Sequence, residues 1–174
     1  MNSEKMKSNT HVKDLVITAM LAALVYIATA LLPIQIGPSQ GGLTHLGNVP
    51  LFLAAFLFGK KHSAFAGAIG MSLFDVFSPY AAWAPYTFVI RLVMGYIVGK
   101  IAYDKYKGSS IKWNMIGIVV SGVWMIVGYY IAEAIMVGNL LAPMASIIGN
   151  VVQLGVGAVV SIPLASMLRR YVTQ

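Results

Sequence analysis

Three ionisable side chains interrupt long apolar stretches of the sequence: Asp75, Arg91 and Glu133. If those stretches cross a membrane, each charge costs about 2.5–3.5 kcal/mol even on the mildest insertion scale, so a function is the default explanation. Two carboxylates and a guanidinium are suited to holding a polar solute through charged hydrogen bonds. The structural alternative is that Arg91 only neutralises one of the two acids.

Uncharged polar residues and aromatic residues accompany these charges. His45 and Asn48 are about one helical turn apart, and Asn150 and Gln153 share that spacing, so each pair falls on one helix face. Aromatic walls carrying a few hydrogen-bonding groups suit a small planar heterocycle. The sequence therefore predicts a binding site for such a ligand, formed by His45, Asn48, Asp75, Trp83, Tyr86, Arg91, Tyr130, Glu133, Asn139, Asn150 and Gln153.

Each of these residues also has an ordinary structural interpretation. The tryptophan and the tyrosines are typical of the belt that aromatic residues form at a membrane interface. His45 could cap a helix or face water, and Asn150 and Gln153 could join neighbouring helices by hydrogen bonds. What favours a binding site is that the whole set falls at one membrane depth.

The composition of the chain is that of a membrane protein. Of its 174 residues, 59% are apolar and only 10% are charged, against roughly 45–50% and 25% in ordinary globular proteins. A single domain of this size, residues 1–174, cannot bury so much apolar surface, so lipid is the expected solvent. Cysteine is absent, which excludes disulfides, thiolate metal sites and a cysteine nucleophile.

Six apolar segments follow a polar start at residues 1–14. They are Leu15–Leu32, Leu46–Phe58, Ser63–Phe77, Pro85–Tyr103, Trp113–Val137 and Pro143–Leu168. A helix needs about 20 residues to cross the hydrocarbon core, and the second and third segments are shorter than that. The second must extend into its flanks or lie beside a thinned or protein-filled region. We expect an all-α integral membrane protein with six transmembrane helices.

The basic residues orient these helices. If the first helix runs from inside to outside, 11 of the 12 basic residues fall on inner segments: Lys5, Lys7, Lys13, Lys60, Lys61, Lys100, Lys105, Lys107, Lys112, Arg169 and Arg170. The outer loops 33–44, 78–84 and 138–142 carry none. This positive-inside bias predicts that both termini, including residues 1–14, are cytoplasmic. The first outer loop, 33–44, is long enough to act as a lid.

The net charge of +7 is explained by this orientation. The basic residues form short clusters between apolar runs, without the continuous basic stripe of a nucleic-acid-binding protein. Basic inner loops face the anionic membrane lipid of the cytoplasmic leaflet. The expected partner of these charges is therefore lipid and not nucleic acid.

With this topology, the three buried charges and the polar pairs all fall in the outer halves of the helices. The inner halves carry little beyond small hydroxyl side chains. A pocket open only to the outside has this distribution. The alternative, a stand-alone secondary transporter or channel for a small polar solute, would need polar groups in the inner half or an inverted repeat. The asymmetry favours capture of a small solute from outside.

No residue pattern indicates catalysis. The segments 59–61 (GKK) and 99–101 (GKI) lack the upstream glycine and the following Ser or Thr of a phosphate-binding loop, so the chain is not expected to hydrolyse ATP. Asp75 and Glu133 lie on different helices, and no Ser–His–Asp set or cluster of metal ligands accompanies them. We therefore expect neither an enzyme, nor a cofactor, nor a metal site.

Several motifs occur in an order that resembles a known family. A basic N-terminus precedes the small-residue pair Ala19 and Ala23 and then the long first outer loop. After it come the segments 44–50 (THLGNVP), 53–59 (LAAFLFG) and 67–70 (GAIG). Over nearly its whole length, the chain resembles the substrate-binding S components of energy-coupling factor (ECF) vitamin transporters. Within that family it is most similar to the hydroxymethylpyrimidine and pyridoxine type.

The resemblance implies a function and a set of partners. An S component in the plasma membrane of a prokaryote captures a small water-soluble vitamin or precursor from outside. It then docks on a membrane scaffold subunit, topples in the membrane and releases its cargo inward, while two cytoplasmic ATPase subunits supply the energy. Small residues let another helix approach closely, and the resemblance assigns Ala19 and Ala23 to the docking face.

Overall fold

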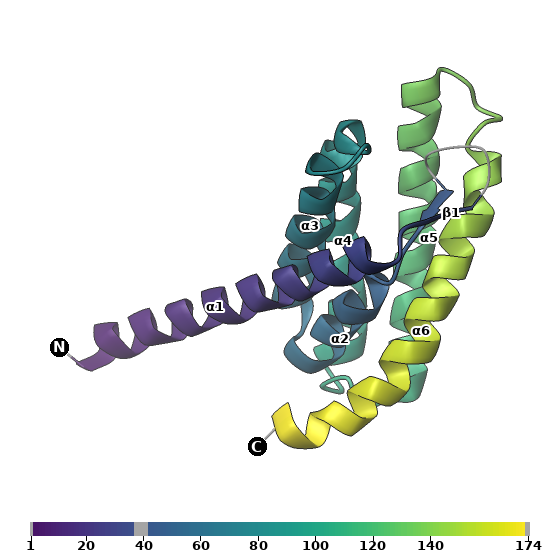
Figure 1. The fold of residues 1–174 in the computed structure, drawn as a ribbon. Helices are drawn as coiled ribbons and strands as arrows, with labels where there is room; N and C mark the ends of the chain where they lie inside the picture. Colours follow the sequence, from purple (N-terminus) through teal and green to yellow (C-terminus); the bar gives the residue numbers. More distant parts are fainter. Residues whose placement is uncertain (1, 37–41, 173–174) are drawn as a thin grey trace.

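Helices make up most of the fold (Figure 1). The computed structural model describes residues 2–36 and 42–172, with side chains from residue 11 onward. The α-helices of this described part are α1 (Asn2–Leu31), α2 (Asn48–Phe58), α3 (Lys60–Val76), α4 (Ala84–Tyr103), α5 (Ile111–Val137) and α6 (Met144–Val172). A short 3-10 helix, η2 (Ala81–Trp83), precedes α4. The predicted helical architecture is thus present.

The segment expected to act as a lid, 33–44, contains a small hairpin that the sequence does not predict. Strand β1 (Ile34–Gln35) pairs antiparallel with β2 (Leu43–Thr44). The Thr44 hydroxyl donates a hydrogen bond to the Gly149 carbonyl of α6 at 3.0 Å, which ties the end of this segment to the helices. The middle of the expected lid, residues 37–41, lies outside the described residues.

Four helical segments of the described chain are long and apolar enough to cross a membrane: His11–Leu31, Ala81–Tyr103, Ile111–Val137 and Met144–Val172. The other two helices are shorter, with 11 residues in α2 and 17 in α3. At a rise of 1.5 Å per residue, α2 is only about 16 Å long. Four of the six expected spans are supported by length and composition, and the other two stay predictions.

The short helix α2 lies at the centre of the bundle. It contacts α1, α3, α4 and α6, and every residue from Pro50 to Leu57 is buried. A helix that is apolar on all sides is expected where all sides are covered. Since other helices enclose α2, the region beside this short segment is filled with protein.

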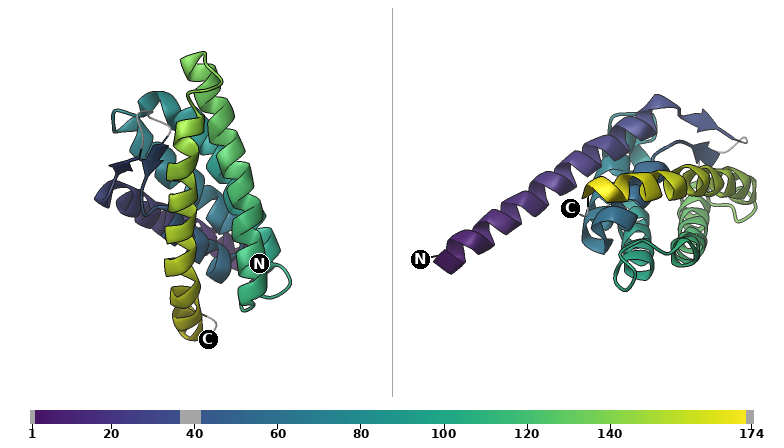
Figure 2. Two further views of the ribbon diagram at one scale, coloured as in Figure 1. Left: turned by 90° about the vertical axis from the view of Figure 1, so that its right-hand side faces the viewer. Right: turned by 90° about the horizontal axis from the view of Figure 1, so that it is seen from below.

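The remaining helices pack as sequential neighbours. Helix α4 contacts α3 and α5, and α6 contacts α5 and α2. In Figure 1 the α3–α4 and α5–α6 connections lie at the upper end of the bundle, and the α2–α3 and α4–α5 connections lie at the lower end with the C-terminus. Helix α1 packs mainly on α3 and extends well beyond the other helices (Figure 2). The upper end therefore gathers two of the three loops predicted to be outer, 78–84 and 138–142.

Close packing between α3 and α4 depends on glycine. A Cβ atom at Gly95 or Gly99 would collide with the backbone of Ser63 or Lys60, and the Ser63 hydroxyl donates to the Gly95 carbonyl at 2.7 Å. At the end of α2, Gly59 has φ 87°, which favours glycine and lets α3 begin at the next residue. Gly95 and Gly99 thus serve internal packing.

Candidate functional site: a buried outer cavity

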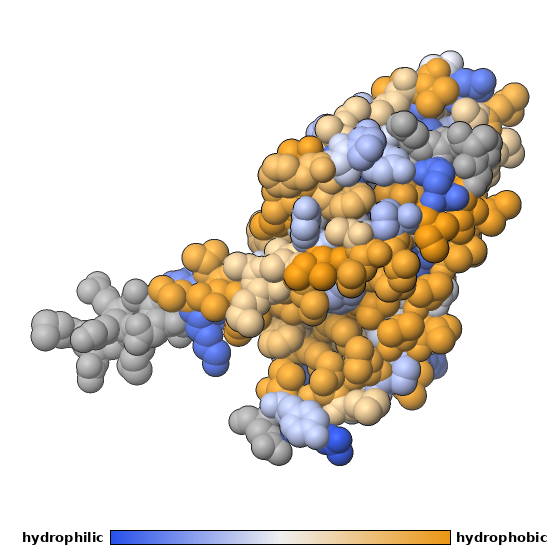
Figure 3. All heavy atoms as spheres, viewed as in Figure 1, coloured by the Kyte–Doolittle hydropathy of each residue, from blue (hydrophilic) through white to orange (hydrophobic). Residues whose placement is uncertain are grey.

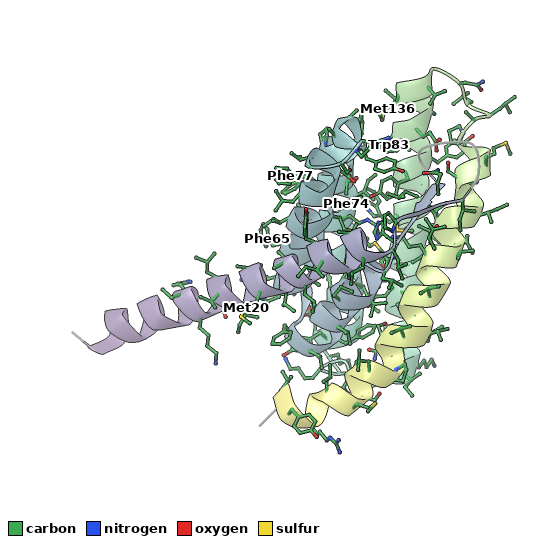
Figure 4. The ribbon with its side chains drawn as sticks, viewed as in Figure 1. Met20, Phe65, Phe74, Phe77, Trp83 and Met136 are labelled. Carbon is green, nitrogen blue, oxygen red and sulfur yellow. The ribbon has the colours of Figure 1, made fainter. Side chains whose placement is uncertain are left out.

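A small polar cavity lies among the upper parts of α3, α4 and α5, bounded also by the β2–α2 segment and by α6. Its volume is about 30 Å³, which is room for one or two water molecules. Figure 4 places Trp83 between the upper ends of α3 and α5. The cavity is lined by Leu43, His45, Met71, Asp75, Tyr80, Trp83, Thr87, Arg91, Tyr129 and Asn150.

Helical spacing brings these side chains together. Trp83, the last residue of η2, is followed at intervals of four residues by Thr87 and Arg91 in the first half of α4. On α3, Met71 and Asp75 share the same interval. Residues four apart lie on one face of a helix. Each helix therefore turns a single stripe of side chains towards the cavity.

Arg91 is the cation of this site and is only 1% exposed. Its Nη1 donates to Asn48 Oδ1 at 2.7 Å and its Nε donates to the Tyr129 hydroxyl at 3.1 Å. The guanidinium also lies 5.1 Å from the centre of the Tyr129 ring, within the range of a cation–π interaction. The sulfur atoms of Met94 and Met125 contact Nη1 on its inner side. These neighbours hold Arg91 in a fixed position, and none of them neutralises its charge.

A hydrogen-bond chain, and not an ion pair, joins Arg91 to Asp75. Among the described residues, Arg91 forms no ion pair with either buried acid. The Tyr129 hydroxyl, which accepts from Arg91, donates to Thr87 at 3.3 Å. Thr87 is in turn hydrogen-bonded to Asp75. The interpretation of Arg91 as the direct structural partner of an acid is therefore not what the structure shows.

Two polar atoms at this cavity have no hydrogen-bond partner among the described residues, namely Asp75 Oδ2 and Trp83 Nε1. Leaving a buried polar atom unpaired costs about 1–3 kcal/mol. Buried polar groups in native proteins are nearly all paired, so the exceptions need an explanation. One unpaired acceptor and one unpaired donor on residues that line the same cavity are suited to a polar ligand.

His45 fastens the β2–α2 segment to α6. The Gly47 N–H donates to His45 Nδ1 at 3.1 Å. The Gln153 side-chain nitrogen lies against the same ring, 3.2 Å from Nδ1 and 3.1 Å from Nε2. Burial, and after it the charge of Arg91, lowers the pKa of His45 well below its ordinary value. His45 is therefore neutral at pH 7 and adds hydrogen bonds, but no charge, to the cavity.

The structure brings most of the predicted binding residues together. Five of the eleven line the cavity: His45, Asp75, Trp83, Arg91 and Asn150. Three are buried near it: Asn48 and Gln153 are hydrogen-bonded to lining residues, and Glu133 is one helical turn from the lining residue Tyr129. Three lie elsewhere: Tyr86, Tyr130 and Asn139.

The last three residues have structural neighbours of their own. Tyr86 is half-buried and packs against the core. The Tyr130 hydroxyl donates to the Leu140 carbonyl at 2.6 Å, and Asn139 Oδ1 accepts from the Leu141 N–H at 2.8 Å, so both organise the α5–α6 connection. One residue of helix is a rotation of 100°. Tyr130 therefore points away from the cavity that its neighbour in sequence, Tyr129, lines.

Sequence reasoning left five lining residues out of its binding set: Leu43, Met71, Tyr80, Thr87 and Tyr129. Thr87 lies midway between Trp83 and Arg91 at helical spacing, so this spacing could have revealed it. Tyr129 is four residues from Glu133, so the same helical spacing could have revealed it. Helical spacing could not have revealed Leu43, because this residue reaches the cavity from strand β2.

A second hollow lies on a different face, between α1 and α3, and we call it the α1–α3 groove. Its volume is about 530 Å³, and it is lined by Leu15, Thr18, Ala19, Ala22, Ala23, Tyr26, Ile27, Ile69, Leu73 and Phe77. Apolar side chains cover this face in Figure 3, and Figure 4 shows Phe77 projecting from α3 there. Ala19 and Ala23 are exposed, whereas the buried Ala22 packs against Gly70.

Comparison with known families identifies the chain. A family model described as "ECF-type riboflavin transporter, S component" matches residues 9–170. The chain belongs to the ECF S-component family. This confirms the resemblance seen in the sequence motifs. An S component is the substrate-binding part of a vitamin transporter and works with an ECF module. It is a multi-pass membrane protein and not an enzyme.

This S component has relatives in both bacteria and archaea. It is 28% identical over 166 residues to the thiamine precursor transporter HmpT of Lactococcus lactis subsp. cremoris (strain MG1363), covering 95% of this chain and 93% of the relative. It is 35% identical over 114 residues to an uncharacterized protein of Pyrococcus woesei, covering 66% of this chain and 74% of the relative.

Solved structures share the fold of this S component. The S component of a bacterial ECF transporter superposes with a TM-score of 0.69 at 21% identity, covering 94% of this chain and 99% of that one. The S component for biotin from an ECF-type ABC transporter gives a TM-score of 0.66 at 19% identity, covering 95% and 94%. At these identities the likeness concerns the fold.

Proposed function

We propose that this S component binds a small vitamin precursor of the hydroxymethylpyrimidine or pyridoxine type in the outer cavity. The observation that carries the proposal is the pair of unpartnered polar atoms at the cavity, Asp75 Oδ2 and Trp83 Nε1. The aromatic rings of Trp83 and Tyr129, whose centres are 6.2 Å apart, line the same space. The name of the relative HmpT, a thiamine precursor transporter, supports the same ligand class.

The size of the cavity favours a single-ring ligand. The family model is named for riboflavin, which has three fused rings, whereas the cavity measures about 30 Å³. Even one ring requires the cavity to widen, and a flavin requires far more. Met94 and Met125, both fully buried, contact Arg91 from the inner side and close the cavity there. Widening a cavity in a close-packed protein interior costs free energy.

We further propose that all six helices cross the plasma membrane of a prokaryote, with both termini in the cytoplasm. The connections rich in lysine, 59–62 and 104–110, are at the same end of the bundle as the C-terminus (Figure 1). The connections without basic residues, 77–83 and 138–143, are at the other end with the cavity. The positive-inside rule then directs the cavity to the outside.

The α1–α3 groove is our candidate for the surface that docks on a membrane scaffold subunit, with two cytoplasmic ATPase subunits supplying the energy. Ala19 and Ala23 are exposed in this groove and leave space for a helix from a partner. Helices in lipid associate closely where their side chains are small. The exposed Phe77 and Leu73 of α3 form the opposite wall.

The inner half of the bundle argues against transport by this chain alone. Below Arg91, most buried side chains of α2, α4 and α5 are apolar, including Phe52, Phe56, Met94, Val98 and Ile118, and the buried polar exceptions on α5 are Ser121 and Asn114. A stand-alone transporter or channel would need polar groups to carry a solute through this layer. The cargo is therefore expected to leave only after the subunit has moved in concert with its partners.

Uptake of labelled hydroxymethylpyrimidine tests the proposed function. A host that lacks its own uptake system would express this chain with or without the scaffold and ATPase subunits. We expect uptake only with the complete set, and a bound pyrimidine in native mass spectrometry of the purified chain. Uptake by this chain alone would refute the proposed mechanism, and a different bound molecule would refute the substrate class.

A further inference from the structure

Glu133 of α5 is fully buried, and neither of its carboxylate oxygens has a hydrogen-bond partner among the described residues. Ser146 of α6 is 2% exposed, and its hydroxyl also lacks a partner there. Neither residue lines the cavity. An unpaired buried carboxylate is among the most costly groups a fold can contain. These two groups therefore need an explanation that the cavity alone does not supply.

The geometry of α5 and α6 places both groups directly outside the cavity. The two helices are in contact and antiparallel, joined by the connection 138–143. Tyr129 of α5 and Asn150 of α6 line the cavity. Glu133 is four residues from Tyr129 towards this connection, and Ser146 is four residues from Asn150 towards it. Both are therefore about 6 Å further out on the same helix faces, by the rise of the helix.

We propose that Glu133 and Ser146 form an outer tier of the ligand site, which accepts a hydrogen-bond donor carried by the ligand ring. The ring itself lies in the cavity that Trp83 and Tyr129 line. A carboxylate only accepts hydrogen bonds, so its partner must donate, as an amino or hydroxyl substituent does. The inference rests on the proposed function, because it assigns the contacts of a ligand in that same cavity.

The charges of the site agree with this ligand chemistry. Asp75, Arg91 and Glu133 are the buried charged side chains of the two tiers, two acids and one cation, and His45 is neutral. A ligand with its own carboxylate would add a third negative charge at a buried site, where like charges repel strongly. The two tiers therefore select a neutral or cationic heterocycle with an exocyclic donor, and they reject acids.

The test compares two ligands on matched variants by titration calorimetry. One ligand is hydroxymethylpyrimidine, which carries a ring amino group, and the other is its analogue with hydrogen in place of that group. We expect the wild type to prefer the amine by roughly 10- to 150-fold, the range of a charge-assisted hydrogen bond. Glu133→Gln should reduce that preference about tenfold, since a neutral amide accepts more weakly. Ser146→Ala should reduce it less.

Ser161→Ala is the control matched to Ser146→Ala. Ser161 is also a fully buried serine of α6, and its hydroxyl also lacks a partner among the described residues. It lies in the inner half, so the preference of this variant should equal that of the wild type. Equal preference in wild type and Glu133→Gln, with hydroxymethylpyrimidine still bound, overturns the outer tier and leaves the proposed function intact. Binding of neither pyrimidine to the wild type overturns both. If Glu133→Gln does not fold, two other measurements decide between these outcomes: the preference of Ser146→Ala for the amine, and the preference of the wild type for it.

Discussion

The outer cavity and the α1–α3 groove are opposite in character although one helix serves both. On α3, Met71 and Asp75 face the cavity, whereas Ile69, Leu73 and Phe77 face the groove. A shift of two residues is a rotation of about 200° around a helix. The cavity is small, buried and polar, and the groove is large, exposed and apolar. The proposed recognition of the ligand and the proposed contact with a partner would thus use separate faces of the same helix.

This separation predicts that each activity can be removed alone. The cavity gains its polarity from helix ends near the α3–α4 and α5–α6 connections, where unpaired donors and acceptors remain available. The groove gains its shape from the small side chains of α1. A tryptophan ring introduced there would collide with a partner helix and not with the rest of this chain. Variants in one region should therefore leave the other region's activity intact.

The largest effect is expected in the groove. Ala23→Trp, or Ala19→Trp, fills the space left by a small exposed side chain and should abolish both uptake and co-purification with the scaffold subunit. Labelled uptake and affinity pull-down measure the two losses. Ala30→Trp is the matched control, because Ala30 is exposed on the same helix outside the groove. Full uptake by both groove variants would show that α1 docks elsewhere.

Asp75→Asn comes next in magnitude and acts on the cavity face of α3. Removing the charge of this carboxylate, whose Oδ2 has no partner among the described residues, should weaken pyrimidine binding by roughly 10- to 150-fold, which corresponds to about 1.5–3 kcal/mol. Calorimetry of the purified protein measures this change. Leu73→Ala, on the groove face of the same helix, should keep the wild-type affinity. Equal affinities for both variants would contradict the division of α3 into two faces.

Asn150→Ala should have a smaller effect on the same affinity, about tenfold. The Asn150 amide already donates to the Ser146 carbonyl of its own helix at 3.1 Å, so only part of its bonding capacity faces the cavity. The same titration measures this change, with unaltered thermal unfolding as the check on folding. An affinity within twofold of wild type would remove Asn150 from the ligand contacts.

The smallest effect is a pH dependence of stability due to His45, whose pKa is lowered from 6.5 by burial and by Arg91. Below pH 6.5 the unfolded chain takes up a proton that the folded chain does not, so stability decreases as pH falls. Between pH 7 and pH 5.5 the loss should be about 1 kcal/mol, or a Tm shift of about 2–4 °C. His45→Asn should lose this slope, and His62→Gln should keep it. Parallel pH profiles for all three proteins would exclude His45.

Sequence reasoning reached the family and most of the cavity because charges inside apolar segments are rare and informative. The S-component assignment is confirmed by the family match over residues 9–170. Asp75 and Arg91 were found by their charge, whereas Thr87 was left out although it lies at helical spacing between Trp83 and Arg91. These features depend only on residue type and on the periodicity of a helix.

The remaining features depend on tertiary structure. Tyr130 and Asn139 were included by depth, but depth does not determine the rotation of a side chain about its helix. The burial of α2 follows from the four helices around it, and its sequence shows only that it is apolar. The division of the small residues of α1, with Ala22 inside and Ala23 exposed, follows from the crossing of α1 over α3.

The dissociation constant of hydroxymethylpyrimidine for purified Ala23→Trp, measured without any partner subunit, tests the separation of the two regions most directly. We predict a constant within about twofold of the wild type, a difference of less than about 0.5 kcal/mol, in a protein that supports no uptake. A loss of binding in parallel with the loss of uptake would contradict this separation.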